Sequence, residues 1–184
     1  MAVDIKYLMT VADFEALPYD EKHRYELIEG ELHVSPAPGI PHQLALNNLQ
    51  FELTNYLRKN PVGTVVPGPN AVLSNHNWVI PDIVFVTKAR WNSLVADDNF
   101  NGPPDLVIEV LSPGNWKHDL NTKRSLYGKF GVLEYWVVDV RNQALMIFRL
   151  NGETLEEIKT IRDDERLESP LLPDLSIRVG DIFS

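Results

Sequence analysis

The sequence predicts a mixed α/β fold in which a central β-sheet is flanked by helices. Residues 106–111 (LVIEVL) form an apolar run interrupted by one acid, which is typical of a strand covered on both faces. Residues 42–57 and 119–130 instead repeat apolar residues at helical steps of three and four. Because strand-like and helix-like segments follow one another along the chain, we expect the helices to pack on the sheet.

The N-terminal segment predicts a short helix and then β-structure. Thr10 is suited to cap a helix over residues 11–17, which Pro18 ends. Residues 24–36 (RYELIEGELHVSP) alternate in the manner of a strand, and Gly30 could bend them into a hairpin. We therefore expect either one strand or a hairpin here.

The middle of the chain predicts a long helix followed by short strands. The helix covers residues 42–57, and strands at 63–66 and 70–74 are separated by the turn sequence Pro-Gly-Pro. Residues 78–86 (WVIPDIVFV) predict the next strand, and residues 88–103 a surface excursion. The proline within WVIPDIVFV cannot donate to a sheet ladder, so we expect the strand to start or bulge there.

The C-terminal half predicts a second helix between strands. The strand PDLVIEVLS (residues 104–112) leads to a helix over residues 119–130, which a glycine ends. Residues 133–140 (LEYWVVDV) and 144–150 (ALMIFRL) predict two further strands. A polar strand and an acidic tail complete the chain.

Length and composition limit the classes of protein. With 184 residues, the chain is predicted to form a single domain over residues 1–184. It contains no cysteine, which excludes disulfides, zinc–thiolate sites and cysteine nucleophiles. It has no apolar run long enough for a membrane span and no signal-like apolar start, so we expect a cytoplasmic protein without membrane contact. The net charge of -9 argues against loose, nonspecific attraction to nucleic acid.

Three acids fall on apolar faces of predicted strands. Because side chains alternate across a strand, Glu26 shares its face with apolar residues of RYELIEGELHV. By the same alternation Asp82 lies on a face with Val84, and Glu109 on a face with Val107. An ionised carboxylate is costly to bury unless it meets a cation or strong donors.

A lysine lies on the apolar stripe of the helix that follows. Lys123 comes three residues after Leu120 and four before Tyr127, so its side chain is predicted to point toward the sheet. Asp119 lies one turn earlier and could orient the lysine.

Each charged residue also has a local explanation. Asp82 could cap a turn, Lys123 could extend along the surface toward water, and the glutamates could pair with arginines. Converging carboxylates, however, repel each other unless a cation lies between them, and oxygen ligands suit Mg²⁺ or Mn²⁺. A nearby lysine would then hold an attacking water or stabilise developing charge.

These residues resemble the PD-(D/E)XK nuclease superfamily, in which an acid after a proline and an acid in a hydrophobic strand precede a lysine. The chain is more closely similar to the Uma-two-type restriction endonuclease family, a domain of unknown function within that superfamily. The segments RYELIEGEL and VIPDIVFV and the run over residues 104–139 carry the similarity, which extends over nearly the whole chain. The resemblance implies a restriction-endonuclease-like fold, with a central mixed sheet flanked by helices.

The resemblance also implies a metal site and its ligands. Asp82 and Glu109 would hold Mg²⁺ or Mn²⁺, the backbone carbonyl of Val110 could add a third ligand, and Glu26 would be an auxiliary catalytic acid. The lysine that the superfamily places two residues after the second acid is replaced by Leu111. The closer family places its lysine on the following helix, where Lys123 lies, as a migrated catalytic lysine.

Two further residues are auxiliary candidates beside Asp119. His42 opens the helix over residues 42–57 and could bind phosphate, orient a ligand carboxylate, or be a satisfied buried histidine. Ser112 ends the strand after Glu109 and could also reach the metal shell.

The leading functional hypothesis is a Mg²⁺-dependent endonuclease that hydrolyses DNA phosphodiester bonds. RNA is a second possible substrate, and a homodimer would supply two active sites for the two strands of a duplex. The first alternative is a catalytically weak or inactive module that binds nucleic acid or protein on the same fold, which the acidic balance favours. The second is a metal-dependent hydrolase of a small phosphoester.

Overall fold

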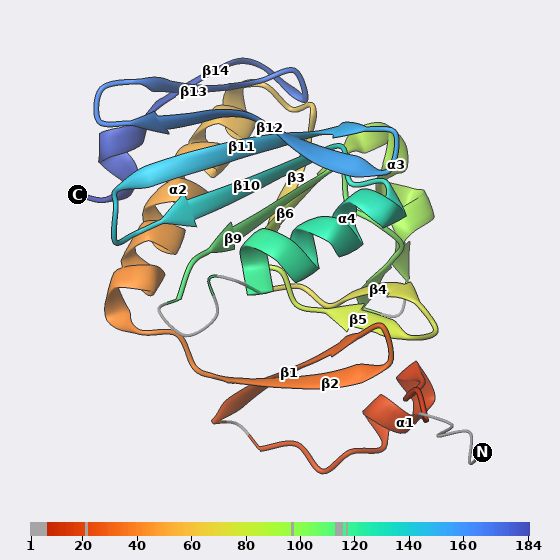
Figure 1. Ribbon diagram of the computed structural model, residues 1–184. Helices are drawn as coiled ribbons and strands as arrows, with labels where there is room; N and C mark the ends of the chain where they lie inside the picture. Colours follow the sequence, from red (N-terminus) through yellow and green to blue (C-terminus); the bar gives the residue numbers. More distant parts are fainter. Residues whose placement is uncertain (1–6, 21, 97, 113–115, 117) are drawn as a thin grey trace.

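The computed structural model describes residues 7–20, 22–96, 98–112, 116 and 118–184 (Figure 1). Within these residues, two six-stranded sheets, a C-terminal hairpin and several helices form two apolar cores.

A mixed sheet of strand order β12-β11-β10-β9-β6-β3 contributes side chains to both cores. Its central strands β9 and β10 run parallel, and the other neighbours are antiparallel. We call it the central sheet. Its strands are β3 (Gly63–Pro67), β6 (Ile83–Thr87), β9 (Leu106–Val110), β10 (Glu134–Asp139), β11 (Ala144–Asn151) and β12 (Thr154–Arg162).

The second sheet has the order β2-β1-β5-β4-β8-β7 and begins with the N-terminal hairpin. We call it the N-terminal sheet. Its strands are β1 (His23–Ile28), β2 (Glu31–Pro36), β4 (Ala71–Ser74), β5 (Asn77–Val79), β7 (Val95–Ala96) and β8 (Asn99–Asn101). Strands β13 (Arg166–Ser169) and β14 (Leu172–Arg178) form a separate antiparallel pair.

Helices cover both faces of the central sheet (Figure 1). The long helix α2 packs on one face, together with the C-terminal hairpin, and α4 packs on the other. The helices are α1 (Val11–Glu15), α2 (Ile40–Lys59), α3 (Lys88–Leu94), a π-helix (His118–Lys123), α4 (Arg124–Phe130) and a 3-10 helix (Val179–Ile182). In the described part of the chain, none of them has the length and apolar composition needed to cross a membrane.

Alternation along the central strands explains the two cores. In β6 and β9, Phe85 and Ile108 face α2, whereas Val84 and Val107 face the opposite core, which includes Tyr127 of α4. Every residue of β9 is buried, as its continuous apolar pattern predicts.

Local signals at both ends of the chain were read correctly. Thr10 caps α1 through its side chain, and Asp13 completes a capping box. The segment around Gly30 is a hairpin, whose turn places Glu29 and Gly30 at positive φ. Gly131 ends α4 in the left-handed conformation that favours glycine.

Residues 78–86 form parts of two strands rather than one, and the expectation that a strand starts at Pro81 is confirmed, because β6 begins at Ile83. The chain leaves the N-terminal sheet after β5 and enters the central sheet at β6, with Ile80, Pro81 and Asp82 between the two. Pro81 has no N–H to donate, so a continuous ladder cannot pass through it. The backbone of Ile80 bonds to side chains instead, donating to Glu26 Oε1 (2.9 Å) and accepting from Arg24.

Two other segments are more structured than the sequence suggests. Residues 88–103 contain α3, β7 and β8, and they bury Leu94 and Phe100 rather than forming only a surface excursion. The acidic tail contains β13, β14 and the 3-10 helix, whose buried side chains extend the core under α2. These side chains are Leu167, Leu172, Leu175, Ile177, Val179 and Ile182.

Candidate active site

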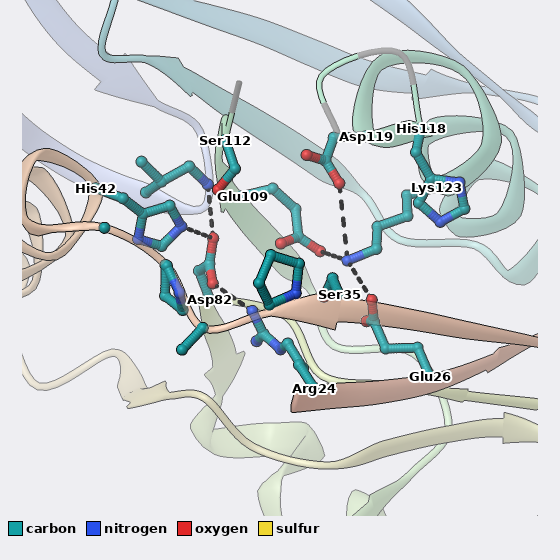
Figure 2. A pocket seen from close by; sticks show the side chains of 15 residues that line it. Arg24, Glu26, Ser35, His42, Asp82, Glu109, Ser112, His118, Asp119 and Lys123 are labelled. Atoms are coloured by element: carbon teal, nitrogen blue, oxygen red, sulfur yellow. Dashed lines mark hydrogen bonds and ion pairs between the residues drawn. The ribbon is translucent and has the colours of Figure 1, made fainter. Parts of the chain in front are cut away.

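The two predicted metal ligands lie opposite each other where the central sheet meets the N-terminal sheet. Ile83 pairs with Ile108 in the antiparallel register of β6 and β9, so the next position places Asp82 beside Glu109. Both are almost completely buried, at 4% and 2% exposed. Figure 2 shows them side by side in the pocket.

The ammonium of Lys123 contacts three acids, each from a different element: Glu26 of β1, Glu109 of β9 and Asp119 of the π-helix. Its ammonium lies 3.0 Å from Glu109 Oε1, 3.0 Å from Glu26 Oε2 and 3.8 Å from Asp119 Oδ1 (Figure 2). The lysine is only 3% exposed, so it does not extend along the surface to water. The structure therefore brings together Glu26, Glu109, Asp119 and Lys123.

The turn that carries Lys123 is a π-helix rather than the ordinary helix that the sequence predicts. It spans His118–Lys123 and continues directly into α4. Asp119 and Lys123, four residues apart, are both buried on its inner side. Single π-helical turns are frequent at functional sites.

Asp82 is surrounded by hydrogen-bond donors. Arg24 donates to Oδ1 at 2.9 Å, while the Val110 amide (2.8 Å) and His42 Nε2 (3.1 Å) contact Oδ2. Sequence reasoning left the role of His42 open and missed Arg24. Alternation could have found the arginine, because Arg24 lies two residues before Glu26 on the same face of β1.

Glu109 differs from the buried carboxylates outside the pocket, Glu134 and Asp105, in how its oxygens are used. Glu134 accepts from Arg149 on Oε1 and from Ser169 and Trp136 on Oε2, and Asp105 likewise uses both oxygens. Within the described part of the chain, Glu109 is contacted by Lys123 and by the Tyr127 hydroxyl (2.8 Å), both through Oε1. Figure 2 shows its other oxygen on the side of Asp82.

The charges of the cluster do not balance. Four carboxylates (Glu26, Asp82, Glu109 and Asp119) face two permanent cations, Arg24 and Lys123, so full ionisation would leave a net charge of -2. Burial, and then the charge of Asp82, raises the pKa of Glu109 to about 8 despite Lys123. Burial and the charge of Glu26 raise the pKa of Asp119 to about 6. Near neutral pH, bound protons thus reduce the surplus negative charge.

The other members of the cluster stay charged. Burial disfavours the ammonium of Lys123, but the charges of Glu109 and Glu26 outweigh it and raise its pKa. Burial also works against the carboxylate of Asp82, yet the hydrogen bond from His42 and the charge of Arg24 hold its pKa well below the ordinary range. For Glu26, Lys123 and Arg24 likewise outweigh burial and lower the pKa.

The donor set fits a divalent cation bound by few protein ligands. Among the described residues, no group of three or more His, Asp or Glu side chains is arranged to hold a metal ion. Asp82 and Glu109 nevertheless offer carboxylate oxygens on one side of the pocket, and the surplus charge of -2 matches a divalent ion. Mg²⁺ is commonly bound through one or two carboxylates, with water and substrate oxygens completing its shell.

The site opens into a cavity of about 190 Å³ whose polar lining is incompletely satisfied. His42 and Ser112 line it, as does His118, which the sequence did not single out. Of the buried side-chain nitrogens and oxygens that the structure describes, His42 Nδ1 and His118 Nε2 lack a hydrogen-bond partner. Buried polar groups are normally paired, so this lining is suited to a bound polar group.

Comparisons with known proteins agree with this architecture. The Uma2 family, described as "Putative restriction endonuclease", matches residues 11–180. The solved structure of "a putative nuclease belonging to DUF820 from Anabaena variabilis ATCC 29413" superposes with a TM-score of 0.78 at 19% identity, covering 95% of this chain and 97% of that one. A search of curated proteins gave no match. The predicted fold is confirmed.

Proposed function

Because the chain belongs to the Uma2 restriction endonuclease family, we propose that it hydrolyses DNA phosphodiester bonds with a divalent cation at Asp82 and Glu109. The observation that carries this proposal is the pairing of these two buried acids across β6 and β9, with Lys123 3.0 Å from one of them. Asp105 and Glu134, two buried carboxylates outside the pocket, are bonded through both oxygens, whereas the described contacts of Glu109 use only one.

Asp82 and Glu109 would hold Mg²⁺ or Mn²⁺, and the carbonyl of Val110 would be a third ligand. The ion would lower the pKa of a bound water and neutralise the phosphate. Arg24 and His42 keep Asp82 ionised and fix its orientation through contacts of 2.9 and 3.1 Å. The hydroxyl of Tyr127 fixes the orientation of Glu109 through a hydrogen bond of 2.8 Å.

Lys123 acts as a fixed positive charge beside the reacting phosphate. Its carboxylate neighbours keep it protonated, so it serves by orienting the attacking water or stabilising transition-state charge rather than by accepting a proton. Glu26 and Asp119 position this ammonium from opposite sides of the pocket (Figure 2).

Removal of either proposed ligand tests the assignment. We expect Asp82→Asn and Glu109→Gln to abolish Mg²⁺-dependent cleavage of supercoiled, linear and single-stranded DNA while circular dichroism shows an intact fold. Glu168→Gln is the matched control, because Glu168 is exposed on β13 and does not line the pocket. Cleavage at the wild-type rate by either ligand variant would overturn the proposal.

The competing function is a binding module without catalysis. The contact between Lys123 and Glu109 favours it, because an ion pair can satisfy both groups without a metal. Calorimetric titration with Mg²⁺ and Mn²⁺ separates the two functions. Heat of binding that disappears in Asp82→Asn supports the nuclease, whereas a silent titration of the wild-type chain supports the module.

A further inference from the structure

A second, larger hollow adjoins the active-site cavity and shares its wall. It has a volume of about 750 Å³ and lies between the N-terminal segment, the start of α2 and the turn after β3. Arg24, Ala37, Pro38 and Asp82 line both hollows. We call the second hollow the aromatic groove, after the rings described next.

Three accessible aromatic rings line the aromatic groove together with the buried Phe14, and they are held in place. Tyr19 and Tyr25 meet edge to face at 5.3 Å, and the ring of Trp78 packs on the buried Phe14 at 5.7 Å. Each polar end is bonded to the protein: the hydroxyl of Tyr19 to a backbone carbonyl (2.7 Å), that of Tyr25 to Asp20 (3.1 Å), and the Trp78 indole to Asn70 (3.3 Å).

These rings nevertheless remain accessible from the groove. Tyr19 is 51% exposed, and Tyr25 and Trp78 are half-buried. Rings with fixed edges and accessible surfaces are suited to stacking against planar ligands, because little conformational freedom is lost on binding.

The aromatic groove reaches the active site around the start of β1. Alternation places Tyr25 on one face of this strand and Arg24 and Glu26 on the other. Arg24 therefore stands at the junction, lining both hollows while its guanidinium bonds Asp82 at 2.9 Å. A strand that passes through the active site can continue past Arg24 into the groove.

The charge of the protein favours stacking over phosphate neutralisation as the source of affinity. The chain carries a net charge of -9, whereas nonspecific duplex binding depends mainly on lysines and arginines that neutralise phosphates. Among the described lining residues, the basic Lys22, His23 and Arg24 are matched by three acids, Glu15, Asp20 and Asp82. Two of these acids are already engaged, Asp20 by His23 at 2.8 Å and Asp82 by Arg24 at 2.9 Å. Base–aromatic stacking contributes affinity to single-strand binding without neutralising a phosphate.

We propose that the aromatic groove binds unpaired nucleotides of the DNA strand, so that the cleaved bond lies beside single-stranded or locally opened DNA. This inference rests on the proposed nuclease function and specifies its substrate. The bases stack on Tyr19, Tyr25 and Trp78 while the backbone runs past Arg24 into the active site.

Fluorescence anisotropy with a labelled single-stranded oligonucleotide and the matching duplex tests the proposal, in a Glu109→Gln background that prevents cleavage. We expect tighter binding of the single strand, and about tenfold weaker single-strand binding in Tyr25→Ala and in Tyr19→Ala, the effect of losing one base stack. Tyr25→Phe keeps the ring but loses the hydrogen bond to Asp20, so it should weaken binding much less than Tyr25→Ala does. Phe51→Ala, which removes a 60% exposed ring on α2 outside the groove, should also have no effect.

The rings could instead serve only to hold the N-terminal segment on the sheet, and the variants distinguish this role. Unchanged single-strand binding in folded Tyr19→Ala and Tyr25→Ala overturns the proposal, as does an equal loss in Tyr25→Phe and Tyr25→Ala. Should Tyr25→Ala fail to fold, Tyr19→Ala still decides, because Tyr19 is half exposed.

The failure of this inference differs from that of the proposed nuclease function. One outcome is metal-dependent cleavage that prefers duplex DNA, with a preference that Tyr19→Ala does not change. This outcome would overturn the proposal for the aromatic groove and support the proposed nuclease function. The opposite outcome is single-strand binding that weakens when the aromatic side chains are removed, without cleavage under any metal condition. It would support the proposal for the aromatic groove and overturn the proposed nuclease function.

Discussion

Lys123 is the residue whose charge the carboxylate cluster depends on most. Burial alone would drive a lysine toward its neutral form, but Glu109, Glu26 and Asp119 surround it. The attraction is mutual, since Lys123 is also what makes the burial of Glu26 tolerable. Its removal should therefore affect stability as well as chemistry.

We expect Lys123→Met to lower the free energy of unfolding at neutral pH by about 3–5 kcal/mol, because it leaves buried carboxylates without their cation. The measurement is urea unfolding. Lys129→Met is the control: its ammonium lies 3.4 Å from Glu29 on the surface, and such a pair contributes about 0–1 kcal/mol. Equal losses in the two variants would show that Lys123 does not stabilise the cluster.

The pKa of Glu109 predicts how the stability of the metal-free chain depends on pH. This pKa rises from an ordinary value of 4.5 to about 8 in the folded state. Between these values the unfolded chain has lost the proton that the folded chain keeps, so the unfolded state binds fewer protons and stability falls as pH rises. We expect the free energy of unfolding, measured with a chelator present, to decrease from about pH 4.5 to about pH 8.

Glu109→Gln supplies the control for this pH dependence. The amide does not titrate, so the decrease between pH 4.5 and about 8 should become shallower, leaving the smaller contribution of Asp119 up to about pH 6. A profile that is identical in the two proteins would contradict the raised pKa of Glu109.

At the scale of residues, strand alternation identified much of the cluster but not its partners. It selected Glu26, Asp82 and Glu109 because acids on apolar faces are visible in one short segment. Arg24 and Asp82 are 58 residues apart, and their contact depends on how two sheets meet. His118 was missed because the predicted helix begins at Asp119, whereas the π-helical turn already includes His118.

At the scale of elements, the local pattern indicated a break at Pro81 but not that the segments on its two sides belong to different sheets. The apolar run over residues 78–86 has the length and composition of one strand. Its two halves belong to different sheets, since the backbone between them is bonded by side chains of β1 rather than by a neighbouring strand. The same break places Asp82 at the entrance of β6, where it can face Glu109.

Helix α4 contains a glycine whose role is also non-local. Substituting alanine for glycine in a helix normally stabilises it by about 1 kcal/mol. At Gly128, however, a Cβ would lie 2.7 Å from the carbonyl oxygen of Glu153 and 3.2 Å from the amide nitrogen of Leu155. Because this contact is with the backbone of β12, no side chain can rotate away from it.

We expect Gly128→Ala to destabilise the protein by about 1–3 kcal/mol, against the intrinsic helix preference. The control is Asn47→Ala on the exposed side of α2, which should be neutral or slightly stabilising. Thermal unfolding of both variants measures the effect. Stabilisation by Gly128→Ala would mean that α4 can move away from β12.

At the scale of the whole molecule, the sequence predicted the class of fold but not how its layers join. Helical and strand periods are local, so α2, β9 and α4 were found correctly. The second sheet arises from pairings such as β1 with β5 and β4 with β8, which join distant segments. The tail was read as polar because its buried side chains alternate with charged ones on β13 and β14.

The overall charge leads to a prediction about salt. Binding of single-stranded nucleic acid weakens with salt by a logarithmic slope of about 0.7 per neutralised phosphate. The aromatic groove offers Lys22, His23 and Arg24, and Arg24 is already bonded to Asp82. We therefore expect a shallow slope of about 1–2 for the single-stranded oligonucleotide, from anisotropy titrations at several salt concentrations.

Two substitutions separate charge from stacking in this titration. Lys22→Gln should reduce the slope by about 0.7, since it removes one phosphate contact. Tyr25→Ala should weaken binding at every salt concentration and leave the slope unchanged, because base stacking releases no counterions. A steep slope that neither substitution alters would place the DNA on another surface, one that gathers basic residues away from the groove.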